Sequence, residues 1–141
     1  MSNALAEISV MVLDSFAAIS FLRGEAGATR VQEVLTVACR EDRRVLLSVI
    51  SLGEIAYISE RRHGLPAVQT VLSAIQDLPV EVVEVDLQVV LAAAHVKAQH
   101  PISLADAFVV ALALAQDGTI LTGDPEFRSV EGVVPIEWLP V

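Results

Sequence analysis

The segment "PISLADAFVVALALAQDG", residues 101–118, leads directly into "TILTGD", residues 119–124, and these two stretches decide the fold. The first predicts a buried helix from Ser103 to Gly118, because apolar residues fill its body and a proline interrupts the chain before it. The second predicts a short buried strand that ends at Asp124. A buried helix followed at once by a buried strand is typical of a parallel sheet covered by helices.

Asp106 is a carboxylate in the first turn of this otherwise apolar helix. Together with Ser103 it forms an S-x-x-D pattern, which satisfies backbone N–H groups at the start of a helix. An acid there also meets the positive end of the helix dipole, a gain of about 0.3–1 kcal/mol. Capping alone therefore explains Asp106, unless other acids gather at the same place.

Strands and helices alternate along the rest of the chain. Short β-branched runs predict strands, and amphipathic segments bounded by Ser, Pro and Gly predict helices. The alternation predicts a single α/β domain over residues 1–141 with a mainly parallel sheet of four to five strands. Residues 1–7 are interpreted as a flexible or tag-derived N-terminus. The predicted strands are 8–14, 44–49, 80–85, 119–124 and 133–139. The predicted helices are 15–25, 28–42, 51–64, 65–79, 86–100 and 103–118, and "DPEF" predicts a short helical turn capped by Asp124.

The chain carries 18 acidic and 9 basic residues, a net charge of −9. This balance argues against a broad basic surface for nucleic acid. It does not exclude nucleic acid as a partner, because acids gathered around a metal ion would account for part of the excess.

Apolar residues make up 54% of the sequence. The longest unbroken apolar run, Ala107 to Ala115, is far shorter than the roughly 18–20 residues of a membrane span, so no membrane association is expected. The surplus predicts a subunit interface, and hence a homodimer, or a docking surface for a partner. The chain opens without a secretion signal, and its single cysteine suits a reducing cytoplasm.

Four carboxylates stand where predicted helices begin: Asp14, Glu54, Asp106 and Asp124. Asp14 and Asp124 end predicted strands, and Glu54 forms a predicted capping box with Ser51 in the first turn of the helix after the second strand. In an open parallel sheet such positions share the carboxyl edge, where ligands bind. Asp106 follows a helix rather than a strand, so the strand pattern gives less support for placing it at this edge.

A cluster of this kind would raise the pKa of its members or bind a cation, because like charges repel strongly in a cleft. Oxygen ligands without Cys or His favour Mg²⁺ or Mn²⁺ over zinc. A metal held by carboxylates activates water and neutralises phosphoryl oxygens. The pattern therefore favours, without requiring, a site for phosphodiester cleavage.

Four stretches in this order resemble the signature blocks of PIN-domain nucleases, and most closely the short VapC-type toxins: "VMVLDSFAAISFLRGE", "ISLGEIAYI", "ISLADAFVVALA" and "ILTGDPEF". The resemblance implies a three-layer α/β/α fold and a Mg²⁺- or Mn²⁺-dependent endoribonuclease. It also implies a homodimer and a cognate antitoxin that silences the enzyme by covering its active site. Housekeeping RNA processing, or a PIN-like module that binds without catalysis, remains the alternative.

The family's characteristic side chains fall on these positions: acids on Asp14, Glu54, Asp106 and Asp124, and hydroxyls on Ser15 and Thr122. By this resemblance Asp14 and Asp106 are expected to bind the metal directly, and Asp124 directly or through water. Glu54 is expected to bind a second metal or to orient the attacking water, and the two hydroxyls to support the acids. Phe16 departs from the small or polar residue of many relatives.

Arg61 lies seven residues after Glu54, almost two helical turns along the same face. There it could hold an RNA phosphate, or it could simply be a solvated helix end. Two other Mg²⁺-binding classes fit the sequence poorly. A phosphatase of the haloacid-dehalogenase type needs D-x-D where the chain has "DSF", and a receiver domain needs a lysine after a late strand, whereas Lys97 lies in a predicted helix.

Overall fold

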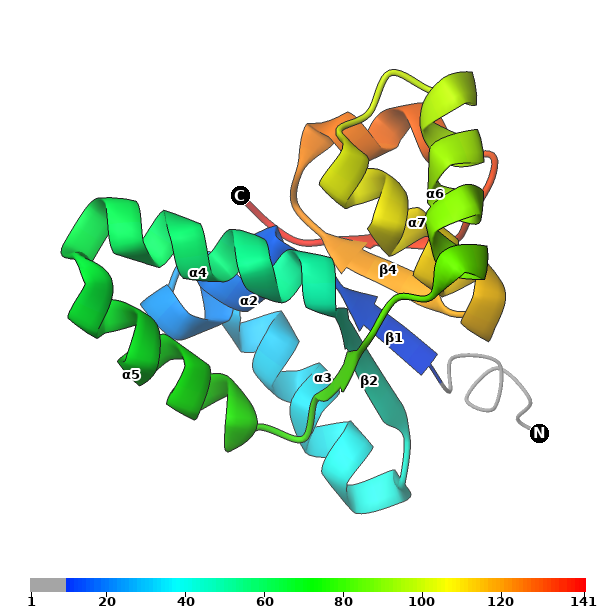
Figure 1. Cartoon of the computed structure of the whole chain (residues 1–141). Helices are drawn as coiled ribbons and strands as arrows, with labels where there is room; N and C mark the ends of the chain where they lie inside the picture. The colour runs from blue at the N-terminus through cyan, green and yellow to red at the C-terminus, as the bar shows by residue number, and fades with distance from the viewer. Residues whose placement is uncertain (1–9) are drawn as a thin grey trace.

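A five-stranded parallel sheet lies between layers of helices in the computed structural model, which describes residues 10–141 (Figure 1). The predicted α/β fold is confirmed, and its sheet is parallel throughout. The predictions for residues 1–7, and for a first strand beginning at residue 8, fall outside the described part of the chain. The strands are β1 (Val10–Leu13), β2 (Arg44–Ser48), β3 (Glu81–Val83), β4 (Thr119–Thr122) and β5 (Ile136–Trp138).

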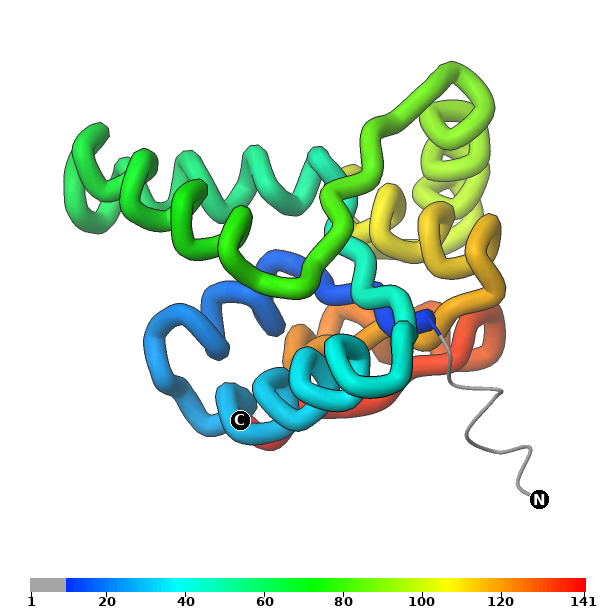
Figure 2. Tube along the Cα trace, turned by 90° about the horizontal axis from the view of Figure 1, so that it is seen from below, coloured from blue at the N-terminus to red at the C-terminus, as the bar shows by residue number. Residues whose placement is uncertain are grey.

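The two faces of the sheet are covered by different helices. The α6, α7 and η1 elements pack on one face, while α2 and α3 pack on the other, joined by buried side chains of α4 and α5. The α4–α5 hairpin extends to the side opposite α6 and α7, as both views show (Figures 1 and 2). The helices are α2 (Ser15–Arg23), α3 (Ala28–Glu41), α4 (Val49–His63), α5 (Leu65–Gln76), α6 (Leu87–Gln99), α7 (Leu104–Gln116) and the 3-10 helix η1 (Pro125–Val130).

The apolar body of α7 is explained by its position in the core. Residues 106–113 are all buried between the sheet and α6. Because both faces of the sheet are covered, β1 buries Met11 and Leu13 on one side and Val12 on the other. Within the described residues, no single helix is both long and apolar enough to cross a membrane, and α6 and α7 reach that length only as a pair bent by 116°.

One predicted helix start and one predicted helix cap are wrong. Helix α4 begins at Val49 and is capped by Ser48, whose Oγ accepts the Ile50 N–H at 3.1 Å, so the Ser51–Glu54 capping box does not form. Strand β2 runs into α4 without a loop, which moves the cap back to the last strand residue and places Glu54 in the second turn. Helix α2 begins at Ser15, but its cap is Asp14 rather than Ser15, the cap that the sequence suggested. The predicted Ser103 cap of α7 is confirmed, and Asp86 and Asp124 cap α6 and η1.

The strand order is β3-β2-β1-β4-β5. The chain builds outward from β1 through β2 to β3, then returns by α6 and α7 to place β4 on the other side of β1. Such a reversal leaves a crevice at the carboxyl ends of the two adjacent strands, the usual ligand position in open α/β sheets. The last residues of β1 and β4, and those that follow them, therefore define the place to look for a site.

Candidate active site

Asp14 and Thr122 lie side by side at the crevice between β1 and β4. Their position follows from strand register, which pairs Leu13 with Leu121. Thr122 Oγ1 donates to Asp14 Oδ2 at 2.5 Å, and the other carboxylate oxygen accepts the Ala17 N–H at 2.8 Å as the cap of α2. Both side chains are buried. Asp14 is thus fixed in orientation through both of its oxygens.

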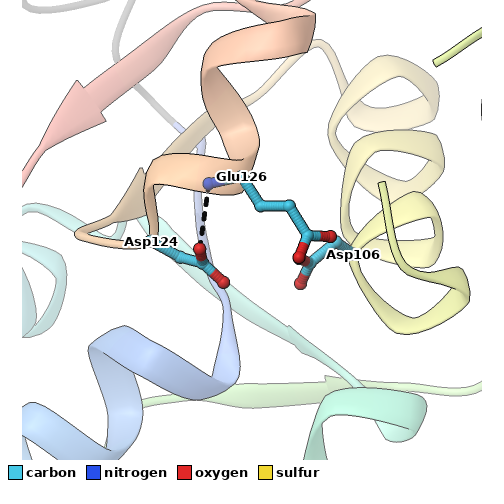
Figure 3. Close-up of side chains that lie close together, drawn as sticks. All are labelled: Asp106, Asp124 and Glu126. Carbon is cyan, nitrogen blue, oxygen red and sulfur yellow. Dashed lines mark hydrogen bonds between the residues drawn. The ribbon is translucent and has the colours of Figure 1, made fainter. Parts of the chain in front are cut away.

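Three carboxylates from two elements converge beside this pair (Figure 3). Oxygens of Asp106, Asp124 and Glu126 lie within 4.8 Å of one another. Asp106 projects from the first turn of α7 and is buried, Asp124 caps η1 and is half-buried, and Glu126 is exposed. The structure therefore brings together two of the four predicted acids with one that was not predicted.

Glu126 is the site residue that sequence reasoning missed. Its Oε1 accepts the backbone N–H of Ser103, the cap of α7, at 2.5 Å, and its own N–H donates to Asp124 Oδ1 at 2.9 Å. These bonds join the start of η1 to the start of α7 and hold the three acids in one cluster. The signal was present in "DPE": an acid two residues after a capping aspartate lies in the first turn of the same short helix.

Burial and like charge both act on the cluster. Desolvation raises the pKa of Asp106 from 3.8 to about 8, reinforced by the negative charges of Asp124, Asp14, Glu126 and Glu54. Burial also raises the pKa of Asp14 from 3.8 to about 7, although its bonds from Thr122 and the Ala17 N–H oppose the rise. The charges that act on Asp106 are thus all negative.

Glu54 and Ser15 form a second pair at the edge of the cluster. Ser15 Oγ donates to Glu54 Oε1 at 2.9 Å and fixes the direction of that half-buried carboxylate. Glu54 and Asp14 are outside the three-carboxylate group, yet both are close enough to raise the pKa of Asp106. Arg61 is exposed near the end of α4, where its guanidinium lies 5.1 Å from the centre of the Tyr57 ring.

The Phe16 ring packs against Gly123, which follows β4. A Cβ at position 123 would lie 2.4 Å from Phe16 Cε1, so the aromatic ring occupies the space that any larger residue there would need.

The donor set fits a divalent cation with a preference for oxygen. The three converging side chains supply carboxylate oxygens, which suit Mg²⁺ or Mn²⁺ rather than zinc. Bringing several like charges together is costly unless they are protonated or neutralised, and a bound cation removes that cost. Burial first, and then the same repulsion, raises the pKa of Asp106.

The fold and the site together define an α/β/α domain with an acidic cluster at the carboxyl edge of a parallel sheet. The family model described as "PIN domain" matches residues 11–133, and the chain belongs to this family. PIN domains are generally nucleases that depend on a divalent metal. No curated protein matches the sequence.

Solved structures share the fold at low sequence identity. A VapBC2 structure from Rickettsia felis, bound to a promoter DNA fragment, has a TM-score of 0.73 at 14% identity and covers 93% of this chain and 99% of that one. A DNA-bound VapBC from Salmonella typhimurium has a TM-score of 0.73 at 20% identity, covering 90% and 96%. VapC20 from Mycobacterium tuberculosis, a toxin that cleaves the sarcin-ricin loop, has a TM-score of 0.66 at 21% identity, covering 86% and 94%.

Proposed function

We propose that this protein is a Mg²⁺- or Mn²⁺-dependent endoribonuclease and the toxin of a VapBC-type toxin–antitoxin pair. The observation that carries the proposal is the convergence of Asp106, Asp124 and Glu126, whose carboxylate oxygens lie within 4.8 Å of one another. Membership of the PIN family supports the nuclease. The similar VapC20 toxin, which cleaves an RNA loop, supports RNA as the substrate.

In this proposal Asp106, Asp124 and Glu126 hold the metal, with Asp14 beside them as a further ligand. A bound divalent ion supplies charge neutralisation at the phosphate and lowers the pKa of a water. Thr122 keeps Asp14 oriented and, by accepting the Asp124 N–H at 3.0 Å, ties Asp14 to the backbone that carries Asp124. Glu54, held by Ser15, accepts the proton of the attacking water or binds a second ion.

The test is RNA cleavage by the purified chain with Mg²⁺, with Mn²⁺ and with EDTA, using a structured RNA labelled at one end. We expect cleavage only with metal, and none from Asp106→Asn. That variant removes charge from a buried cluster, so its melting temperature is measured alongside to show that it folds. Equal cleavage by Asp106→Asn, or cleavage that survives EDTA, would overturn the proposal.

The toxin role is proposed from the similar structures, two of which are VapBC complexes. A cognate antitoxin would cover the acidic cluster and block the substrate. Expression of the chain in a bacterial cytoplasm should arrest growth, and Asp106→Asn should not. Cleavage in vitro without growth arrest would instead favour a role in RNA processing.

We also propose a homodimer, on the basis of the apolar surface of α6. Leu87 is 74% exposed and Leu91, one turn further along, is 60% exposed, with Val90 exposed between them. An uncharged helix face of this kind favours self-association in a protein whose net charge is −9. Light scattering at micromolar concentration should give twice the monomer mass, and Leu87→Glu should shift the protein toward monomer.

A further inference from the structure

Tyr57 is an exposed aromatic side chain on α4, three residues after Glu54. It is the only tyrosine of the chain, and 46% of it is exposed. The Arg61 guanidinium lies over its ring, 5.1 Å from the centroid, and is itself exposed. A planar cation held over an exposed ring is an arrangement that presents stacking surface and hydrogen-bond donors together.

The pair follows Glu54 along one stripe of α4. Residues 54, 57 and 61 are spaced by three and four, which places them on the same side of a helix. Tyr57 is therefore about 4.5 Å and Arg61 about 10.5 Å further along the helix axis than Glu54. Glu54 is thus at one end of this stripe, and its charge contributes to the raised pKa of Asp106. The exposed Tyr57–Arg61 pair is at the other end.

The far end of α4 is basic, in contrast to the cluster near its start. Arg61, Arg62 and His63 form the last turn, and Arg23 at the end of α2 lines the same groove as Arg62. In the described part of the chain, neither Arg61 nor Arg62 forms an ion pair with a carboxylate. Within an acidic protein this end is therefore available to a phosphate.

We infer that Tyr57 and Arg61 form a binding site for an unpaired RNA nucleotide next to the scissile phosphate. The base stacks on the Tyr57 ring, and Arg61 contacts the adjoining phosphate. A base can stack on a side chain only when it is free of its own helix, so the site selects single-stranded or looped RNA over a duplex. The inference rests on the proposed nuclease function and adds the class of substrate.

The experiment measures binding separately from cleavage. Asp106→Asn serves as a background that does not cut, and fluorescence anisotropy follows a labelled oligouridylate about ten nucleotides long. Tyr57→Ala should weaken binding about 5- to 150-fold, the range seen for loss of one base–aromatic stack. Tyr57→Phe, which keeps the ring, should bind within about twofold of the background protein. A blunt RNA duplex should bind weakly and respond little to Tyr57→Ala.

Arg61→Ala tests the phosphate contact, with Arg40→Ala as its matched control because Arg40 is also an exposed helical arginine. Loss of one phosphate contact to a single strand should lower the slope of log affinity against log salt by about 0.7. The control should leave that slope unchanged.

Equal oligouridylate affinity in Tyr57→Ala and the background would overturn the inference, as would a lowered melting temperature with no loss of binding, which would mark a purely structural pair. These results are distinct from failure of the proposed function. If the wild type cleaves RNA and Tyr57→Ala binds oligouridylate as well as the background protein, only the inferred stacking site would be wrong. If Tyr57→Ala loses oligouridylate binding but the wild type does not cleave RNA, only the proposed nuclease function would be wrong.

Discussion

The two ends of the parallel sheet differ in how their charged side chains are arranged: the amino end has an ion pair, and the carboxyl end has a group of carboxylates. At the amino end, Arg44 at the start of β2 donates to both carboxylate oxygens of Glu81 at 3.0 Å, and also to Gln116 at the end of α7. At the carboxyl end, four other carboxylates act on Asp106 and raise its pKa, in addition to its burial. The charge of Arg44 is therefore balanced by Glu81 within the protein. The carboxylates near Asp106 would instead be balanced by protons or by a bound cation.

This difference separates charges that support the fold from charges that serve a ligand. An exposed pair such as Arg44–Glu81 contributes about 0–1 kcal/mol and is satisfied within the protein. A buried acid with a raised pKa lowers the stability of the metal-free fold at neutral pH. Such a cost is expected where a site is held ready for binding. Four changes would break or sharpen the contrast.

The largest effect is expected when one acid is neutralised at each end. Asp124→Asn should lower the cleavage rate about 10²- to 10⁴-fold, because several kcal/mol of transition-state stabilisation depend on the metal. Glu81→Gln makes the same change of charge at the amino end and should leave the rate unchanged. Initial rates at saturating Mg²⁺ measure both. Similar losses in the two variants would mean that the contrast between the ends has no catalytic meaning.

The stability of the metal-free protein should fall as pH rises. Asp14, with a pKa of about 7, and Asp106, with a pKa of about 8, hold protons that the unfolded chain releases near pH 4. The native state therefore binds more protons, and the free energy of unfolding should drop by on the order of 6 kcal/mol between pH 5 and pH 8. Urea unfolding in EDTA measures this drop.

Asp106→Asn should flatten that pH profile and raise stability at pH 8, while abolishing the rise in melting temperature that Mg²⁺ gives to wild type. A wild-type profile that is flat, or that rises over this range, would contradict the charge crowding inferred at the carboxyl end.

A smaller effect is expected from Thr122→Val, which keeps the shape of the side chain but removes its hydroxyl. Asp14 would lose a donor and the Asp124 N–H would lose an acceptor. We expect a loss of about 1–3 kcal/mol in the free energy of unfolding and a loss of about 10- to 100-fold in metal affinity. Calorimetric titration with Mn²⁺ measures the second quantity, and Thr122→Ser, which restores the hydroxyl, should recover most of it.

The smallest effect is expected at the amino end. Arg44→Met keeps much of the aliphatic stem and removes the ion pair with Glu81, at a cost below about 1 kcal/mol that disappears in high salt. Thermal unfolding at low and high salt measures it. A loss of several kcal/mol would show that the amino end is as specialised as the carboxyl end.

The order of elements could be predicted because each signal is local. β-branched runs mark the strands, and the Ser103 and Asp124 caps are found where the sequence indicates. Helix α4 began earlier than expected because Ser48 and Ser51 are equally good caps, and continuity with β2 decided between them. Glu126 was missed because its role depends on the Ser103 N–H, which is 23 residues away along the chain.

The sequence by itself determined an α/β domain with acids where its helices begin, since hydrophobic period and capping chemistry act over only a few residues. The tertiary structure decided which of those acids meet. Asp106 follows a helix rather than a strand, and it reaches Asp124 because α7 is buried against the sheet with its first turn at the carboxyl edge. Charge crowding is a property of distances through space, so it arises only when the packed fold brings those oxygens together.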